Sequence, residues 1–314
     1  MSASSELDYS GPYSSEPENP ADLRGFVDLH SHTDASDGSL SPPALIELAV
    51  SLRLDALAVT DHDTFAGYAV AAPVARDAGL DLVCGIELNT RLCPPEGHSR
   101  SMHLLAYFLA APPTESFMTW LGKLQQDRRD RNEKLVKALR AAGVEITLEE
   151  VERIGRSITG RPHFARVLIK KGYATDYRDA FRRFLGEDAP TYVEHESPDT
   201  EAVIAEVLAG GGMPVVPHPV RLMFPDQFTE RQAIEKLQRA GLAGLEVYHS
   251  DHSAERQAYY LEMARSLDLV PTGGSDFHGA PKPDVALGTG RNNVRVPAGV
   301  LAAMRDFRPV PCPR

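Results

Sequence analysis

Short apolar runs alternate with amphipathic stretches along most of the chain from residue 26 onward. The runs are rich in valine, leucine and isoleucine, as the buried strands of a parallel sheet are. We expect strands at 26–29, 55–60, 81–88, 102–109, 213–217, 243–248 and 269–273. Between them the pattern predicts helices at about 41–52, 64–78, 198–210, 229–240 and 253–268. Strands that alternate with helices indicate βαβ units in an α/β sheet or barrel.

The stretch 111–189 breaks this alternation. It reads as almost all helix, at 114–142, 147–154, 162–172 and 176–186. Residues 121–185 hold 16 lysines and arginines against nine acidic residues, although the whole chain has a net charge of −11. We therefore predict a basic helical insertion over residues 111–189, between the two halves of an α/β core at 25–110 and 190–314. Such an insertion would attract a polyanionic substrate.

On the long helix of this insertion, the run Arg128-Arg129-Asp130-Arg131 has two interpretations. It could face a ligand, or it could form a solvated helix face with pairs such as Asp127 with Arg131. We favour the solvated face for these arginines.

The composition is that of a globular protein without a membrane span or a disulfide framework. The chain has 314 residues, of which 42% are hydrophobic and 25% charged, as in soluble globular proteins. It has no apolar run of about 20 residues that would predict a membrane span. Three cysteines without a Cys-x-x-Cys motif predict no disulfide framework and favour the reducing cytoplasm. Residues 1–24 are rich in serine, glutamate, proline and glycine and are predicted to be a disordered tail.

Polar residues gather where the predicted strands end. His30 and His32 are two residues apart, so in a strand both imidazoles point to one face and can share an ion. The carboxyl ends of parallel strands form the active face of α/β proteins, so these side chains are expected to converge there. Any one of them alone is better explained as a turn, capping or core residue, but together they predict a metal centre. Histidine, aspartate and glutamate without cysteine suit zinc, manganese or iron.

Five motifs, in this order along the chain, resemble those of the polymerase and histidinol phosphatase (PHP) superfamily. They are His30-Ser-His32-Thr-Asp-Ala-Ser-Asp37-Gly38, Thr60-Asp-His62-Asp, Gly85-Ile-Glu87, Pro217-His218-Pro219 and Gly274-Ser-Asp276-Phe-His278. The resemblance covers residues 26 to 290. With Thr159-Gly-Arg161-Pro-His163 it is greatest to the small stand-alone phosphoesterases, which include nucleoside 3′,5′-bisphosphate phosphatases and 5′-to-3′ exoribonucleases. It implies a distorted (β/α)7 barrel with a helical insertion.

The resemblance implies a centre of two or three divalent ions (manganese, zinc or iron). The first ion would be held by His30, His32, Glu87 and Asp276, the second by Glu87 as a bridge with His103 and His218, and the third by Asp37, His62 and His278. Such a centre hydrolyses a phosphomonoester or terminal phosphodiester, with a hydroxide held between two ions attacking phosphorus. Asp276 or a central histidine could transfer the proton.

Other residues are candidates for the substrate side. Arg161 and His163 lie at the start of a predicted helix, where an arginine, a histidine and free amides suit a phosphate group. His249 and His252 follow a strand and have equal prospects of facing substrate or solvent. We expect a small phosphorylated partner, such as a nucleotide or a short 5′-phosphorylated RNA end. No membrane partner and no stable binding of duplex nucleic acid are expected.

Three alternatives remain open. A histidinol-phosphate phosphatase would have the same metal ligands and a different substrate. A metal-binding PHP module without catalysis would be expected to have lost some ligands, whereas the whole set is present here. A carbon–nitrogen hydrolase of the metal-dependent amidohydrolase type also carries His-x-His on its first strand. It would need a lysine that bridges two ions, and no lysine ends a predicted strand here.

Overall fold

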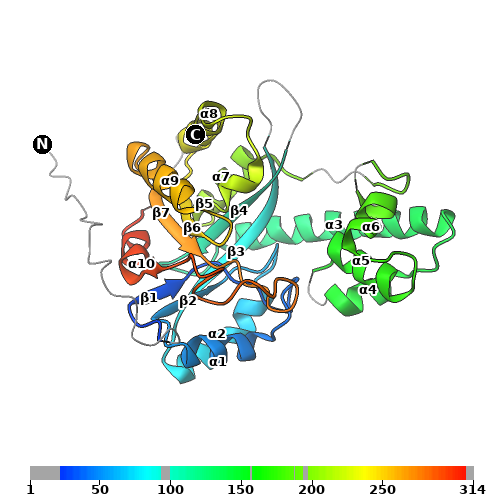
Figure 1. The fold of residues 1–314 in the computed structure, drawn as a ribbon, viewed down its shortest axis with the longest axis horizontal. Coiled ribbons are helices and arrows are strands. Elements are labelled where there is room, and N and C mark those ends of the chain that lie inside the picture. Colours follow the sequence, from blue (N-terminus) through cyan, green and yellow to red (C-terminus); the bar gives the residue numbers. More distant parts are fainter. Residues whose placement is uncertain (1–21, 93–99, 156–157, 187, 194–196, 309–314) are drawn as a thin grey trace, which may run out of the picture.

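The computed structural model describes residues 22–308 except 93–99, 156–157, 187 and 194–196. Its core is a single sheet that curls into a nearly closed barrel (Figure 1). The strand order is β7-β6-β5-β4-β3-β2-β1-β8. The sheet closes just beyond the ends of β1 and β7, where the amide of Leu29 donates to Gly273 O at 3.2 Å and that of Asp276 to His30 O at 2.8 Å. The strands are β1 (Phe26–Asp28), β2 (Ala56–Val59), β3 (Asp81–Leu92), β4 (Arg100–Phe108), β5 (Met213–Val216), β6 (Gly244–His249), β7 (Val270–Gly274) and β8 (Val296–Pro297).

The predicted barrel is confirmed, but its strands are not all parallel. β3 pairs antiparallel with β4, and β4 pairs antiparallel with β5. Seven residues separate β3 from β4, too few for the crossover that parallel neighbours need. β3 is also four residues longer than predicted, so Glu87 lies inside a strand and His103 lies in the first half of β4. The expectation that the polar residues gather where the strands end was therefore wrong for Glu87, whereas His103 lies within a strand, as the predicted range 102–109 implies.

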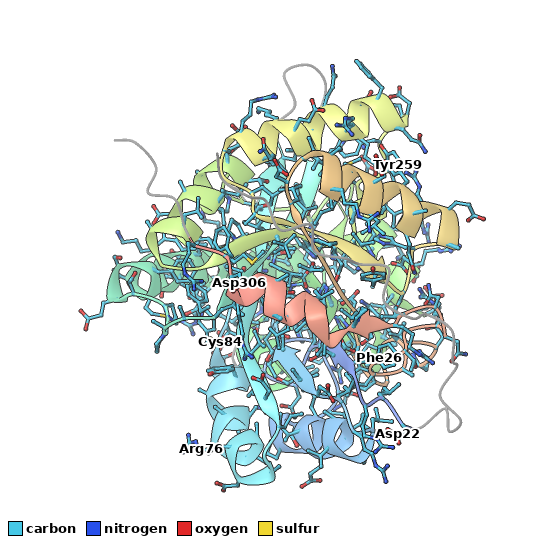
Figure 2. The ribbon with its side chains drawn as sticks, turned by 90° about the vertical axis from the view of Figure 1, so that its left-hand side faces the viewer. Asp22, Phe26, Arg76, Cys84, Tyr259 and Asp306 are labelled. Carbon is cyan, nitrogen blue, oxygen red and sulfur yellow. The ribbon has the colours of Figure 1, made fainter. Side chains whose placement is uncertain are left out.

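Helices cover the outside of the barrel. A serine or aspartate caps most of them, as Ser41 does for the first, by accepting from the amide of Ala44. The outer helices are α1 (Pro42–Ser51), α2 (Ala66–Ala78), α7 (Thr200–Ala209), α8 (Gln227–Arg239), α9 (Ala254–Ser266) and α10 (Ala298–Arg305). Strand β8 and helix α10 were not predicted. Figure 2 shows α10 lying across the end of the barrel that faces away from the insertion, between Phe26 and Cys84.

The insertion projects from the opposite side of the barrel (Figure 1). It contains α3 (Glu115–Ala141), α4 (Leu148–Gly155), α5 (Arg161–Lys170), α6 (Tyr177–Ala180) and a π-helical turn at Phe181–Leu185. Helix α3 takes part in two separate hydrophobic cores. Phe117 and Leu121 pack into the barrel, whereas Leu135 and Leu139 pack into a small core within the insertion.

The described part of the predicted N-terminal tail is ordered. Leu23 is fully buried, and its amide donates to Leu52 O at 2.9 Å. The predicted boundary at residue 24 was therefore too late, because an apolar side chain at residue 23 already joins the core; residues 1–21 lie outside the described part. Within that part, no helix combines the length and the apolar character needed to cross a membrane.

Candidate metal centre

Glu87 lies at the centre of a cluster of histidines at the end of the barrel that faces the insertion. Its Oε1 is 2.8 Å from Nδ1 of His103 and 2.9 Å from Nε2 of His218. Its Oε2 is 3.3 Å from Nε2 of His30, 3.1 Å from Nε2 of His32 and 3.4 Å from Nδ1 of His62. The Glu87 side chain is 1% exposed. One buried carboxylate thus reaches five imidazoles, which is the geometry of a bridging ligand.

The remaining predicted ligands complete two clusters around Glu87. The inner cluster consists of His30, His32, Glu87 and Asp276, and the outer cluster of His32, Asp37, His62 and His278; within each, the potential ligand atoms lie within 4.8 Å of one another. His32 belongs to both, because its Nε2 faces Glu87 while its Nδ1 is 3.6 Å from Asp37 Oδ1. The structure brings all nine predicted ligands together.

The donor atoms fit divalent ions. Nε2 of His30, both ring nitrogens of His32 and Nδ1 of His62 are buried and make no hydrogen bond. A buried polar atom without a partner is costly, and native proteins rarely leave several in one place. Here the unpartnered nitrogens face carboxylate oxygens across gaps that an ion coordinated by both would span. Imidazole and carboxylate together suit zinc, manganese or iron.

The electrostatics of the cluster favour the metal-binding form of Glu87, His62 and His218. For His30 and His32, burial alone would lower the pKa, but the surrounding carboxylates raise it, to about 9 for His32. Burial alone would raise the pKa of Glu87, but the imidazoles of His103, His62 and His30 hold it well below the usual range. Burial lowers the pKa of His62 to about 4 and that of His218 to about 3. The carboxylate is therefore charged and these two rings are neutral near pH 7, which are the states in which they coordinate a metal.

A second layer of side chains supports the ligands. Glu246 on β6 lies with Oε1 3.0 Å from Nδ1 of His30, and its Oε2 accepts from the amide of His218 at 2.6 Å. The cationic groups of Arg221 and Lys282 lie 2.8 Å and 2.6 Å from Oδ2 of Asp276. These three residues were missed as site residues, although Glu246 belongs to a polar cluster at the end of a predicted strand.

A cavity of about 770 Å³ lies between this cluster and the insertion. Residues of the metal cluster form one wall, including Asp37, His62, Glu87, His103 and Asp276. The other wall contains arginines 128, 131 and 161, Ile158 and Phe181 from the insertion, together with Tyr192 and Val193 from the segment that follows it. The cavity therefore has an acidic and imidazole-rich side facing a basic and partly aromatic side.

The preference for a solvated arginine run was wrong for Arg128 and Arg131. Arg131 is 6% exposed, and its Nε has no hydrogen-bond partner. Burial, with Arg128 and Arg161 nearby, lowers the pKa of Arg131 to about 9, so it stays charged near pH 7. Arg128 contacts Asp63 rather than solvent. The two arginines are three positions apart and so share a helix face, a spacing that could have suggested a common inward orientation.

The residues predicted to bind substrate differ in whether their side chains are free to contact a ligand. Arg161 lines the cavity. His163 also borders it, but Gly160 N donates to its Nδ1 at 3.1 Å, so its proton is on Nε2, which donates to Ser36 O at 3.0 Å. Both nitrogens of His163 are thus used by the backbone, which leaves none for a phosphate.

His249 and His252 are both buried side chains. Nε2 of His249 is 3.5 Å from Asp276 Oδ2, which places this ring beside the metal cluster. His252 lies behind it, 5.2 Å away between ring centroids, with Nδ1 directed at Val247 O. His252 does not line the cavity, so its position does not suit the predicted substrate contact.

Comparison with known proteins decides the family. The PHP domain model matches residues 28–186. The chain is 34% identical to the 5′-3′ exoribonuclease Rnm of Escherichia coli, over 88% of this chain and 91% of that one. The chain belongs to the PHP family. This confirms the resemblance inferred from the five motifs, and with it a metal-dependent hydrolase.

Two further PHP relatives cover most of the chain. One is the 3′,5′-nucleoside bisphosphate phosphatase of Chromobacterium violaceum, 31% identical over 80% of this chain and 87% of that protein. The other is a solved structure from Bifidobacterium adolescentis, described as a candidate metal-dependent phosphoesterase. It is 30% identical, with a TM-score of 0.74 over 90% of this chain and 96% of that one. The similarity therefore includes the insertion as well as the barrel.

Proposed function

We propose that this PHP enzyme hydrolyses a phosphate ester of a small nucleotide that carries a second phosphate group. The substrate would be a nucleoside 3′,5′-bisphosphate or the end of a short 5′-phosphorylated oligoribonucleotide. The observation that carries this proposal is Arg131, which is buried in the cavity wall opposite the metal cluster and whose Nε has no hydrogen-bond partner among the described residues. Relatives named as a 3′,5′-nucleoside bisphosphate phosphatase and a 5′-3′ exoribonuclease support it.

The two walls of the cavity suit two phosphate groups. Divalent ions held by Asp37, His62, Glu87, His103, Asp276 and the other ligands would polarise the ester phosphate and supply a nucleophile near pH 7. The second phosphate would lie against Arg131 and Arg161, because a buried guanidinium without a carboxylate gains most from an anionic ligand. Pockets of about 300–1,000 Å³ are typical for small ligands, and this cavity is within that range.

Other residues are placed to bind the nucleoside and the reacting phosphoryl group. Phe181 and Tyr192 are aromatic side chains in the cavity wall, on which a base could stack. Arg221 and Lys282 reach the cavity beside Asp276 and would stabilise negative charge that develops on phosphoryl oxygens.

We propose Asp276 as the group that transfers a proton during hydrolysis. Burial alone would raise its pKa, but His30, His278 and Lys282 hold it well below its usual range. Its carboxylate is therefore charged near neutral pH and can accept a proton but cannot donate one.

Product release from a panel of substrates tests this function, measured as inorganic phosphate from the monoesters and as nucleotide from the RNA. The purified protein is loaded with Mn²⁺ and assayed on a nucleoside 3′,5′-bisphosphate, the matching 3′-monophosphate, a short 5′-phosphorylated RNA and histidinol phosphate. We expect the bisphosphate to have the highest kcat/KM and Arg131→Met to raise its KM at least about tenfold, with little change for the 3′-monophosphate. Arg140→Met, an exposed arginine on the same helix, is the control. Fastest turnover of histidinol phosphate would contradict the proposal.

A further inference from the structure

Three side-chain contacts join the insertion to the rim of the barrel. Nε2 of Gln125 on α3 donates to Asp63 O at 2.8 Å, and the guanidinium of Arg128, one turn further, pairs with the Asp63 carboxylate. On α5, Nε2 of His163 donates to Ser36 O at 3.0 Å. Beyond the packing of the first turns of α3, these contacts join the insertion to the barrel rim at Asp63 and Ser36.

Both points lie next to a ligand of the outer metal cluster. Asp63 follows His62, and Ser36 precedes Asp37. Within the inner and outer clusters these two ligands have the most exposed side chains, with Asp37 24% and His62 19% exposed, whereas those of His30 and Asp276 in the inner cluster are 0% and 3% exposed. The outer cluster is thus the part of the metal centre that borders the insertion.

The backbone at Asp63 is held in an unusual conformation. Asp63 has a φ of +49°, a left-handed value that glycine adopts freely and that asparagine and aspartate adopt more readily than other residues. Its amide donates to Glu87 O at 3.0 Å, and its carboxylate accepts from the amide and the side chain of Asn89 at 2.9 and 2.8 Å. Asp63 thus joins the barrel strand that carries Glu87 to the helix that carries Arg128.

The loop that carries Asp37 is connected in a similar way. The Asp61 carboxylate accepts from Ser36 Oγ at 2.5 Å and from Thr33 N at 2.8 Å. His163 holds the other side of the same loop through Ser36 O, and its own ring is fixed by Gly160 N. The position of Asp37 therefore depends on a barrel residue on one side and on an insertion residue on the other.

We propose that docking of the insertion and binding of a divalent ion by the outer cluster are coupled, with Asp63 and His163 as positioning residues. This rests on the proposed metal-dependent function. When the insertion is docked, His62 and Asp37 are held together and bind the ion more tightly. By the reciprocity of coupled equilibria, the bound ion holds the insertion against the barrel to the same extent. The cavity would then be complete only when the outer cluster is occupied.

Mn²⁺ binding to the full chain tests one direction of the coupling. The metal-free protein is titrated with Mn²⁺ alone, and the bound ions are counted by elemental analysis. Asp63→Asn removes the charge that holds Arg128 and keeps a residue that tolerates a left-handed backbone. His163→Phe removes both hydrogen bonds, and Gln125→Ala is a milder third variant. We expect each variant to lower the affinity for one Mn²⁺ ion by about 10-fold or more and to leave the affinities for the tighter-bound ions unchanged.

Arg129→Ala is the matched control for these variants. Arg129 is the neighbour of Arg128 on α3, but it pairs with Glu152 within the insertion at 2.9 Å. Its loss should leave all Mn²⁺ affinities as in the wild type. Wild-type Mn²⁺ binding in Asp63→Asn, His163→Phe and Gln125→Ala would overturn the coupling.

Hydrogen exchange tests the reverse direction. We expect Mn²⁺ to slow exchange of the α5 amides in the wild-type protein by about 10-fold. His62→Ala, in the outer cluster, should abolish this slowing, whereas His218→Ala, outside it, should retain it. Equal slowing in His62→Ala would overturn the coupling alone. Absence of Mn²⁺ binding in the wild-type protein would overturn the proposed metal-dependent function and the coupling together.

Discussion

The carboxylate of Glu246 lies 3.0 Å from Nδ1 of His30, a residue 216 positions earlier in the chain. This contact sets the tautomer of the His30 ring: the proton on Nδ1 points to Glu246, and Nε2 is left free toward Glu87 and Asp276. Carboxylates that orient a metal-binding histidine in this way are a common second layer of metal sites. The ring is therefore oriented with Nε2, the nitrogen that would coordinate an ion, directed at the inner cluster.

We predict that substitutions of Glu246 weaken metal binding without touching a ligand. Glu246→Leu removes the acceptor for His30 and should lower Mn²⁺ affinity by about 10- to 100-fold. Glu246→Gln keeps an acceptor and should have a smaller effect. Titration of the metal-free protein measures both, and Glu262→Gln, on the exposed side of α9, is the control. A larger loss in the glutamine variant than in the leucine variant would contradict the tautomer argument.

Removing the buried charge of Arg131 should stabilise the protein while weakening substrate binding. A guanidinium at 6% exposure that pairs with no carboxylate of the described residues loses hydration without a compensating ion pair. Arg131→Met keeps most of the side-chain volume, and we expect it to raise the free energy of unfolding by about 1 kcal/mol in substrate-free protein. Urea denaturation measures this change. A clear loss of stability would show that Arg131 has a structural role instead.

Two glycines in helices should respond oppositely to alanine. A Cβ on Gly67 in α2 would meet Asp61 Oδ2 at 1.9 Å and Thr33 Oγ1 at 2.5 Å, the hydrogen-bonded pair that orders the Asp37 loop. We expect Gly67→Ala to lower the free energy of unfolding by about 2 kcal/mol or more. A Cβ on Gly122 in α3 would have no atom within 4 Å. Gly122→Ala should therefore raise the free energy of unfolding by about 0.5–1 kcal/mol. Thermal or urea unfolding of the two variants distinguishes them, and similar effects would contradict the packing described here.

His252 should make the metal-free protein sensitive to acid. Burial lowers its pKa from 6.5 to about 4. Between these values the unfolded chain binds a proton that the folded chain does not, so stability falls as the pH falls from about 6.5 toward 4. A difference of this size corresponds to at most about 3 kcal/mol. The pH dependence of unfolding measures it, and His252→Phe should have a flatter profile over this range. An unchanged slope in that variant would assign the effect to other groups.

The candidate metal ligands could be predicted from the sequence because they lie in short motifs that can be recognised without knowing the fold. The spacing of His30 and His32 and the order of the five motifs identify ligands whatever the exact strand geometry. Strand direction was harder: the pairing of β3 with β4 depends on a short connection, and the alternation of apolar runs alone does not distinguish a hairpin from a crossover. Glu87 was therefore expected at the end of its strand, whereas it lies inside β3, and both Glu87 and His103 stay predicted ligands.

The substrate side could not be predicted in the same way. Whether Arg131 faces water or a cavity depends on how the insertion docks, and no pattern within α3 determines that. His163 illustrates the opposite case, since its position near the site was anticipated but its two nitrogens are used by Gly160 and Ser36. The short elements β8 and α10 near the C-terminus were missed because two residues of strand and eight of helix leave little periodic signal.

Helix α3 is one uninterrupted element of 27 residues that begins in the core of the barrel and ends in the core of the insertion. At 1.5 Å per residue it is about 40 Å long, so it acts as a stiff lever. A tilt of about 5° at the barrel end would move the far end by roughly 3.5 Å, about the thickness of one nucleobase. The packing of Phe117 and Leu121, far from any reacting group, therefore fixes the angle of the helix and with it the distance between the two walls of the cavity.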